Sequence, residues 1–238
     1  MLTYQAMLSM RDEDDSYLTG ARAIAPLAVG VAIYGMAFGL LATQAGFSPF
    51  EITGMGGVVF AGSSQIVFTQ QWLAGAGALA ALAAAVALNL RILLITGSIP
   101  DVCAGRPFWQ VALAAHLAAD ENWAMLLARR AAGGAAGYRF FVGAGLVQFV
   151  VWLAATTAGA VLSEAIPDPR RLGMDFAFTA AFIAIALTLF RGRADVAPWA
   201  ASLAVVLIAV ATGWLAPPWA LVLGGVSGAA VAGVFGHD

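Results

Sequence analysis

Two stretches of the chain place ionisable side chains in otherwise apolar sequence. The stretch VALNLRILLITGS carries Asn89 and Arg91, and the stretch AADENWAML carries Asp120 and Glu121. A charged side chain at the centre of a membrane helix costs about 2.5–3.5 kcal/mol on insertion scales, so it needs a partner or a water-filled cavity. An arginine can hold a carboxylate, and an acid can carry a proton or meet an ammonium group. These four residues are therefore candidates for ion pairing, substrate binding and proton coupling.

A second polar cluster lies in the stretch GGVVFAGSSQIVF, which places Gly62, Ser63, Ser64 and Gln65 in mid-segment. Glycine permits backbone distortion, and many carriers bind substrate where broken helices point their N-termini at a substrate carboxylate. Close packing of helices through small residues produces the same pattern. The sequence leaves both interpretations open, and we take these four residues as candidate substrate-binding residues.

The composition indicates the environment in which these residues work. Of the 238 residues, 62% are hydrophobic and only 10% are charged, whereas a soluble domain carries about 25% charged residues. The chain is therefore predicted to be an all-α polytopic membrane protein. A net charge of −2 argues against a nucleic-acid partner. No HExxH, GxSxG or paired Cys–His pattern occurs, so we predict no catalytic residue, metal site or cofactor.

Apolar runs of about 20 residues, the length that crosses a bilayer, are separated by short junctions rich in Gly, Pro and Arg. We predict a cytoplasmic arm over residues 1–22 and a single transmembrane transport domain over residues 23–238. The candidate spans are 24–44, 53–72, 77–99, 108–128, 140–162, 174–190, 196–215 and 218–236.

The second segment is the least regular of these because it is rich in glycine. It either spans or is broken or re-entrant, so the predicted bundle has seven to eight transmembrane helices. An internal repeat is a further candidate feature, since segment one runs into AGFSPFEITGM and segment five runs into SEAIPDPRRLGM, and transporters are often built from repeats.

The arginines predict the orientation, because cytoplasmic loops of membrane proteins are enriched in basic residues. With eight spans, the outer loops hold Arg106, Arg170 and Arg171. The predicted inner loops hold the other seven arginines outside the spans: Arg11, Arg22, Arg129, Arg130, Arg139, Arg191 and Arg193. This distribution places both termini in the cytoplasm.

The predicted helices bring the charged residues to similar depths. Arg91 lies about 13 Å from the end of its segment and Asp120 about 18 Å from the same side, at 1.5 Å per residue. Adjacent segments form a helical hairpin, so Arg91 is expected to pair with Asp120 or Glu121. His116 and Asp120, at i and i+4, are expected to share a helix face. The pair either only ties two helices together or takes part in function.

Several motifs together resemble a known family. The stretches YGMAFGLLATQAGFSPFEITGMGGVVFAGSSQIV, LNLRILLITGSI, AADENWAM, YRFFVGAG and PDPRRLGMDFAFTAAF are similar, in this order, to the large subunit of the AzlC–AzlD branched-chain amino acid exporters. The resemblance covers about residues 20–235. Carried over by position, the motif residues are Gly62, Gln65, Asn89, Arg91, Asp120 and Glu121. The chain departs from the family at Ile92, Ile95 and Thr96, which leaves the substrate's identity open.

The resemblance implies a proton-coupled exporter of hydrophobic amino acids in the bacterial inner membrane, working with a small AzlD-like membrane subunit. Arg91 would pair with the substrate carboxylate in one state and with an acid in the other. The alternative is a non-transporting membrane scaffold or assembly subunit, in which the ion pair only holds helices together.

Overall fold

The computed structural model describes residues 15–165, 183, 190, 192–215 and 217–235, and this part of the chain is helical with no strand. Among the described residues, four helices are long and apolar enough to cross a membrane. They are α2 (Tyr17–Gln44), α5 (Ala78–Ser98), α9 (Tyr138–Val161) and α11 (Arg193–Ala211). The remaining helices are α3 (Pro49–Val58), α4 (Gly62–Leu73), α6 (Pro100–Cys103), α7 (Phe108–His116), α8 (Asp120–Ala131) and α12 (Pro217–Phe235), with a 3-10 turn at Leu162–Ala165.

The all-helical membrane class is as the sequence predicts, but the predicted number of seven to eight transmembrane helices is not confirmed. The segments predicted at 24–44, 77–99, 140–162 and 196–215 correspond to the four long helices. The predicted segment 218–236 corresponds to α12, whose apolar part is shorter. The predicted segment 174–190 lies outside the described residues, apart from isolated positions.

Helices α2 and α9 run parallel and in close contact. At one end, the Asp15 carboxylate, just before α2, accepts hydrogen bonds from the backbone N–H groups of Gly137 (2.8 Å) and Phe140 (2.9 Å), where α9 begins. Near the other end, a Cβ on Gly39 would overlap the carbonyl group of Thr156. Small residues thus let the two backbones approach closely, and both helices begin at the same end of the bundle.

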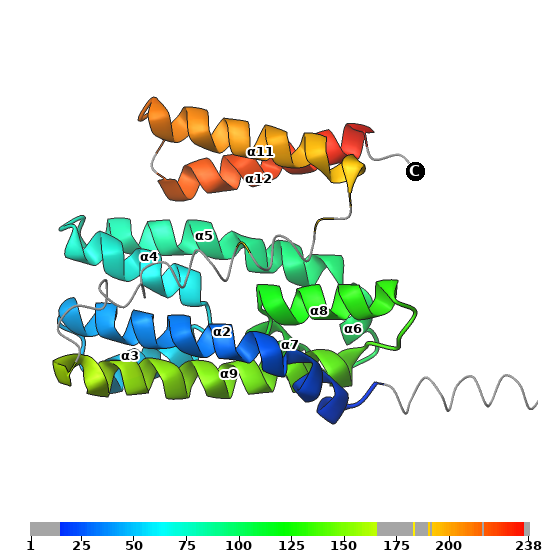
Figure 1. Ribbon diagram of the computed structural model, residues 1–238, viewed down its shortest axis with the longest axis horizontal. Coiled ribbons are helices and arrows are strands. Elements are labelled where there is room, and N and C mark those ends of the chain that lie inside the picture. The colour runs from blue at the N-terminus through cyan, green and yellow to red at the C-terminus, as the bar shows by residue number, and fades with distance from the viewer. Residues whose placement is uncertain (1–14, 166–182, 184–189, 191, 216, 236–238) are drawn as a thin grey trace, which may run out of the picture.

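The second predicted segment is a hairpin of two half-helices. α3 starts beside the end of α2, and Phe60, which follows it, packs edge-on against Phe149 midway along α9 with ring centroids 5.3 Å apart. α4 then returns, since Trp72 near its end contacts Phe47, which precedes α3, at 6.2 Å. The chain enters and leaves at the end of the bundle where α2 and α9 finish (Figure 1). Of the alternatives for this segment, the re-entrant form is the one found.

A capping box starts α3 at that end. The Ser48 hydroxyl accepts a hydrogen bond from the backbone N–H of Glu51, whose carboxylate accepts one from the backbone N–H of Ser48 at 2.8 Å. Pro49 at the first helical position suits this role because its missing N–H would have no helical partner. The local sequence SPFE therefore fixes where the hairpin begins.

The fourth predicted segment is a second hairpin, built from α7 and α8. At its mouth the Tyr138 hydroxyl, at the start of α9, donates to the carbonyl oxygen of Gln110 (3.1 Å). At its tip His116 packs edge-on against Phe149 at 5.5 Å. α8 then returns, and Arg129 near its end lies 5.3 Å from the ring centroid of Phe140. This hairpin enters from the end where α9 begins, opposite to the first.

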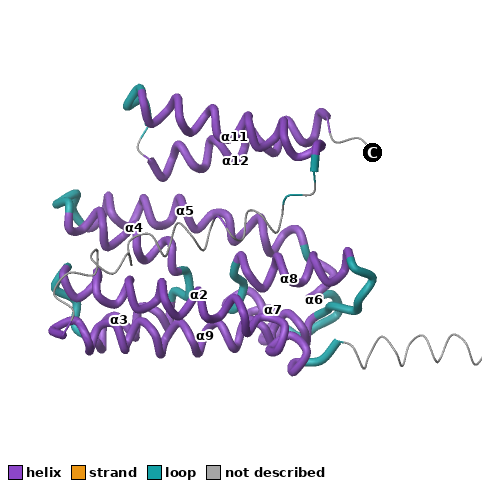
Figure 2. The backbone as a smooth tube through the Cα atoms, viewed as in Figure 1, coloured by secondary structure: helices purple, strands orange, loops and turns teal. Residues whose placement is uncertain are grey.

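The two hairpins therefore enter the bundle from opposite ends, and their tips meet at Phe149. Each has a three-residue break between its half-helices, at 59–61 and at 117–119, and each returning half-helix has 12 residues. Figure 2 shows these non-helical links midway along the long helices. Non-helical backbone at membrane depth is tolerated only where protein or a cavity surrounds it, which the crossing helices provide.

This arrangement is an inverted repeat of one unit, a long helix followed by a re-entrant hairpin. α2 with α3 and α4 forms one copy, and α5 with α7 and α8 forms the other. The repeat predicted from sequence pairs segment one with segment five instead. The turn that would complete its second copy begins near residue 163 and lies mostly outside the described residues, so that pairing stays a prediction.

Two predictions made for a continuous fourth helix are wrong. His116 ends α7 and Asp120 begins α8, so the break places them on different helices and not on one face. Arg106 was predicted on the opposite side from Arg129 and Arg130, yet it lies 3.9 Å from the ring centroid of Tyr138 at the start of α9. Because the segment turns back, these arginines share one end of the bundle, which we call the basic end.

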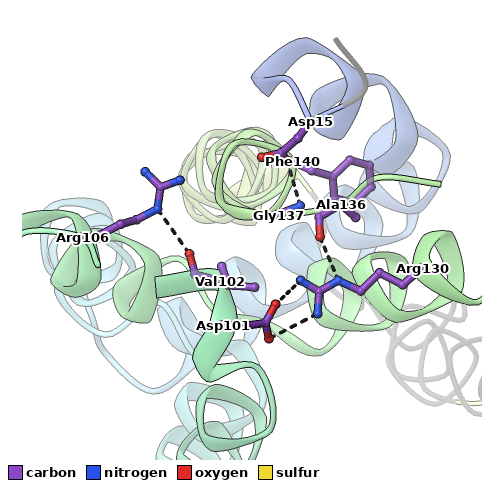
Figure 3. A network of polar contacts seen from close by, with 8 residues as sticks. All are labelled: Asp15, Asp101, Val102, Arg106, Arg130, Ala136, Gly137 and Phe140. Carbon is purple, nitrogen blue, oxygen red and sulfur yellow. Dashed lines mark hydrogen bonds and ion pairs between the residues drawn. The ribbon is translucent and has the colours of Figure 1, made fainter. Parts of the chain in front are cut away.

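Polar contacts at the basic end tie the mouth of the second hairpin to its neighbours (Figure 3). The Arg130 guanidinium donates to the Asp101 carboxylate at 2.6 Å and to the Ala136 carbonyl at 2.8 Å. The hydrogen bonds from Arg130 lower the pKa of Asp101, so this pair is charged at neutral pH. The partly exposed pair links α8 to α6, while Asp15 links the start of α2 to the start of α9.

Asn122 closes the break of the second hairpin, and its replacement is expected to destabilise the fold. Its fully buried amide accepts from the backbone N–H of Ala119 (2.9 Å) and donates to the carbonyls of Leu117 (2.9 Å) and Phe141 (3.3 Å). Each buried group left without a partner costs about 1–3 kcal/mol. We expect Asn122→Ala to lower the free energy of unfolding in detergent by about 3 kcal/mol.

The matched control is Gln70→Ala, which removes an exposed amide from α4, the returning half of the other hairpin. Its free energy of unfolding should stay close to that of the unaltered protein. Equal losses in both variants would contradict the closing role of Asn122.

Candidate functional site

The N-terminus of α4 lies at the tip of the first hairpin with no side-chain cap. Ala61 precedes the helix and provides no hydrogen bond to it, so the first backbone N–H groups of α4 point into the protein interior without a helical partner. Such a helix start carries partial positive charge and favours an anionic group. Because the residues at this helix start, Ala61 and Ser63, are buried, it faces the protein interior and not solvent.

Gly62 lets the tip sit against two large aromatic side chains. A Cβ at this position would overlap the Tyr34 hydroxyl and come within 2.8 Å of Trp152 Cη2. Trp152 is itself buried, stacked on Phe38 at 5.6 Å between ring centroids. The tip is thus seated on a rigid aromatic base formed by α2 and α9.

The three residues that follow carry buried polar atoms that have no hydrogen-bond partner among the described residues. The Oγ atoms of Ser63 and Ser64 and the Nε2 atom of Gln65 all belong to this group. Gln65 Oε1 accepts from Trp152 Nε1 at 3.1 Å, which orients the amide and leaves its N–H groups as donors. Buried polar groups are normally hydrogen-bonded, so these atoms are available to donate to a bound group.

Arg91 and Asp120 form an ion pair between α5 and the start of α8. Arg91 Nη2 lies 3.0 Å from Asp120 Oδ2, and the two side chains are 27% and 20% exposed. Of the two acids predicted as partners, the structure selects Asp120 for this contact. Arg91 and Asp120 lie at similar depths, as predicted, but not because the fourth segment is one continuous helix. Instead α7 stops at the centre of the bundle, and Asp120 starts the returning half-helix.

Glu121 points instead toward α9. Its carboxylate accepts a hydrogen bond from Gln148 Nε2 at 3.0 Å, and Gln148 is almost completely buried, with 1% of its surface exposed. The Oε1 atom of Gln148 has no hydrogen-bond partner in the described part of the chain. Neighbouring acids on α8 thus face different helices, one toward a cation and the other toward a neutral amide.

Asn89, one of the predicted binding residues, lies on α5 two residues before Arg91. Its buried Oδ1 atom has no hydrogen-bond partner within the part of the chain that the structure describes. The Tyr34 hydroxyl lies near both polar clusters. It contacts Gly62 on the first hairpin and lies within electrostatic range of Glu121, Arg91 and Asp120. The predicted residues of both polar clusters therefore gather around the centre of the bundle.

Three residues of this region were not selected from the sequence. Tyr34 and Trp152 look like ordinary aromatic members of apolar segments, and nothing local distinguishes them. Gln148 is different, because it is an isolated amide in the apolar stretch GLVQFVVW, a signal of the same kind as Asn89. Its role depends on Glu121, which is distant in sequence.

Comparison with known families gives one match: the model of the AzlC protein family matches residues 26–166. The chain belongs to the AzlC family. AzlC is a transporter family associated with branched-chain amino acid transport, and it is not a family of enzymes. Comparisons with curated proteins and with solved structures found no match.

The residues matched to the AzlC family include α2 from residue 26 onward, both hairpins, α5 and α9. Helices α11 and α12 lie beyond the match and pack on one another, with α12 contacting α5. The polar region at the hairpin tips therefore lies entirely within the AzlC part of the chain. With its long apolar helices, the protein is a membrane transport protein.

Proposed function

We propose that this protein is a secondary transporter that exports branched-chain or other hydrophobic amino acids, driven by protons. The observation that carries the proposal is the opposed pair of hairpins. Their returning half-helices begin at the centre of the bundle, one uncapped with buried donors and the other with two acids. An amino acid has one negative and one positive group, so these two helix starts offer complementary partners.

The substrate carboxylate is held by the start of α4 and by Arg91. Ser63, Ser64 and Gln65 supply buried donors at that helix start, and half-helix N-termini bind carboxylates in other carriers. In the absence of substrate, Arg91 pairs with Asp120. Exchange of partners at Arg91 gives two states of similar energy, which a ligand with different affinity for each can shift.

An apolar substrate side chain is accommodated by the aromatic residues around the tips. Phe60, Phe149 and Trp152 surround this region with large apolar side chains. This lining favours leucine, valine, isoleucine or methionine over charged amino acids.

The basic end of the bundle faces the cytoplasm in this proposal. Arg22, Arg106, Arg129, Arg130 and Arg139 all lie toward that end, where α2 and α9 begin. The described loops at the opposite end, 45–48 and 74–77, carry no basic residue. Two segments that were predicted to cross turn back instead, so α9 still begins on the same side of the membrane as α2. The N-terminal arm 1–22 is therefore cytoplasmic, and the transport domain 23–238 lies in the bacterial inner membrane.

A small AzlD-like membrane subunit completes the transporter. This part of the proposal follows from the resemblance of the chain to the large subunit of AzlC–AzlD exporters. Its test is co-purification of a co-expressed AzlD-like subunit with this protein, together with the dependence of transport on that subunit.

Reconstitution into liposomes tests the function directly. Liposomes loaded with labelled leucine, valine or methionine should release them when a proton gradient is imposed. Release is compared between liposomes that contain the small subunit and liposomes that lack it. Protein-free liposomes and labelled glutamate serve as controls, and neither should show gradient-dependent release. A chain that folds and assembles but moves no amino acid under any of these conditions is a scaffold subunit, and the proposal is then wrong.

A further inference from the structure

The acid that does not pair with Arg91 has an unusual environment. Glu121 is partly buried, and in the described part of the chain its side-chain hydrogen-bond donor is the neutral amide of Gln148. A carboxylate taken out of water is costly unless a cation or several donors compensate its charge. The Gln148 amide and the backbone N–H of Glu121 itself meet part of this need. Both donors are neutral, so the carboxylate can still accept hydrogen bonds from a cationic group.

Gln148 supplies a second acceptor at the same place. Because its Nε2 atom donates to Glu121, the orientation of the amide is determined by that bond, and Oε1 is directed away from the carboxylate. That oxygen is buried, and no described residue forms a hydrogen bond with it. Glu121 and Gln148 together therefore present acceptors and negative charge, which repel a carboxylate and suit a group with several N–H donors.

We propose that Glu121 and Gln148 form the binding site for the substrate's α-ammonium group. This inference rests on the proposed function and specifies one half of it. The ammonium group donates to Glu121 and to Gln148 Oε1, while the carboxylate is held at the start of α4 and by Arg91. The Tyr34 hydroxyl, near the acids and against Gly62, places the two half-sites in one region.

The assignment gives a physical reason for proton-driven export. A proton on the Glu121 carboxylate removes the charge that holds the ammonium group, and a bound ammonium group blocks the proton. Proton and substrate therefore exclude each other, which is what exchange in opposite directions requires. The pair of Arg91 and Asp120 alone does not provide this, because a substrate carboxylate that takes Arg91 frees Asp120 to accept a proton.

Ligands that lack one of the two charged groups test the inference. Binding to the purified protein is measured for leucine, for 4-methylpentanoate, which lacks the ammonium group, and for 3-methylbutylamine, which lacks the carboxylate. We expect Gln148→Leu, which keeps the side-chain size in an apolar setting, to weaken binding of leucine and of the amine by about tenfold or more. Binding of 4-methylpentanoate should stay within about twofold, since that ligand does not use Gln148.

Gln70→Leu is the matched control, because it removes an exposed amide elsewhere in the bundle and should change none of the three affinities. Gln148→Met provides a second variant of similar size should Gln148→Leu fail to fold. The inference is wrong if Gln148→Leu and Gln148→Met both bind leucine normally. It is also wrong if binding of leucine and of 4-methylpentanoate weakens equally, and neither result affects the proposed function. Absence of leucine binding by the unaltered protein overturns the proposed function as well.

Discussion

Arg91→Gln is expected to reduce leucine export at least tenfold while the protein still inserts in the membrane. The change removes the charge that faces Asp120 at 3.0 Å and that would hold the substrate carboxylate. Hydrogen bonds to charged groups contribute about 1.5–3 kcal/mol, and each 1.4 kcal/mol changes affinity about tenfold. Gradient-driven release of labelled leucine from liposomes measures the effect.

Two further variants separate a transport role of Arg91 from a structural one. Arg91→Gln combined with Asp120→Asn removes both charges of this pair, so neither is left without the other, and it should restore stability but not export. Arg130→Gln is the surface control, because it breaks the partly exposed pair with Asp101 at the basic end, where ion pairs contribute at most about 1 kcal/mol. Normal export from Arg91→Gln, or recovery of export in the double variant, would show that the pair is structural.

Gly62→Ala is expected to remove leucine binding and to lower the melting temperature. The added Cβ would overlap the Tyr34 hydroxyl and lie 2.8 Å from Trp152 Cη2, and neither ring can easily move because both are buried. The start of α4 must then shift away from its aromatic base. Inserting a methyl group into a tightly packed interior costs about 1–3 kcal/mol, and the displaced helix start no longer meets the substrate.

Gly57→Ala is the control in the same hairpin, since a Cβ at Gly57 meets no atom within 4 Å. It should bind leucine normally and melt at or slightly above the temperature of the unaltered protein, because alanine favours helix more than glycine does. Leucine binding by Gly62→Ala at unaltered affinity would place the substrate elsewhere in the molecule.

Much of the candidate site could be predicted from the sequence because polar residues are rare in apolar segments. Asn89, Arg91, Asp120 and Glu121 stand out for that reason alone, as do Ser63, Ser64 and Gln65. The choice between Asp120 and Glu121 could not be predicted, since the two adjacent acids have the same local surroundings. It depends on which helix each faces, and α5 and α9 lie on different sides of α8.

Composition and hydropathy determined that this chain is a helical membrane protein, where its apolar segments lie and which polar residues they bury. Only the tertiary structure decided that the second and fourth segments turn back at the centre. A turning segment and a crossing segment have the same apolar composition, so local sequence does not distinguish them. The turn depends on distant contacts: Trp152 holds Gln65 across 87 positions of sequence, and Phe149 receives both hairpin tips. Those contacts on α9 bring the two helix starts together and turn scattered polar residues into one site.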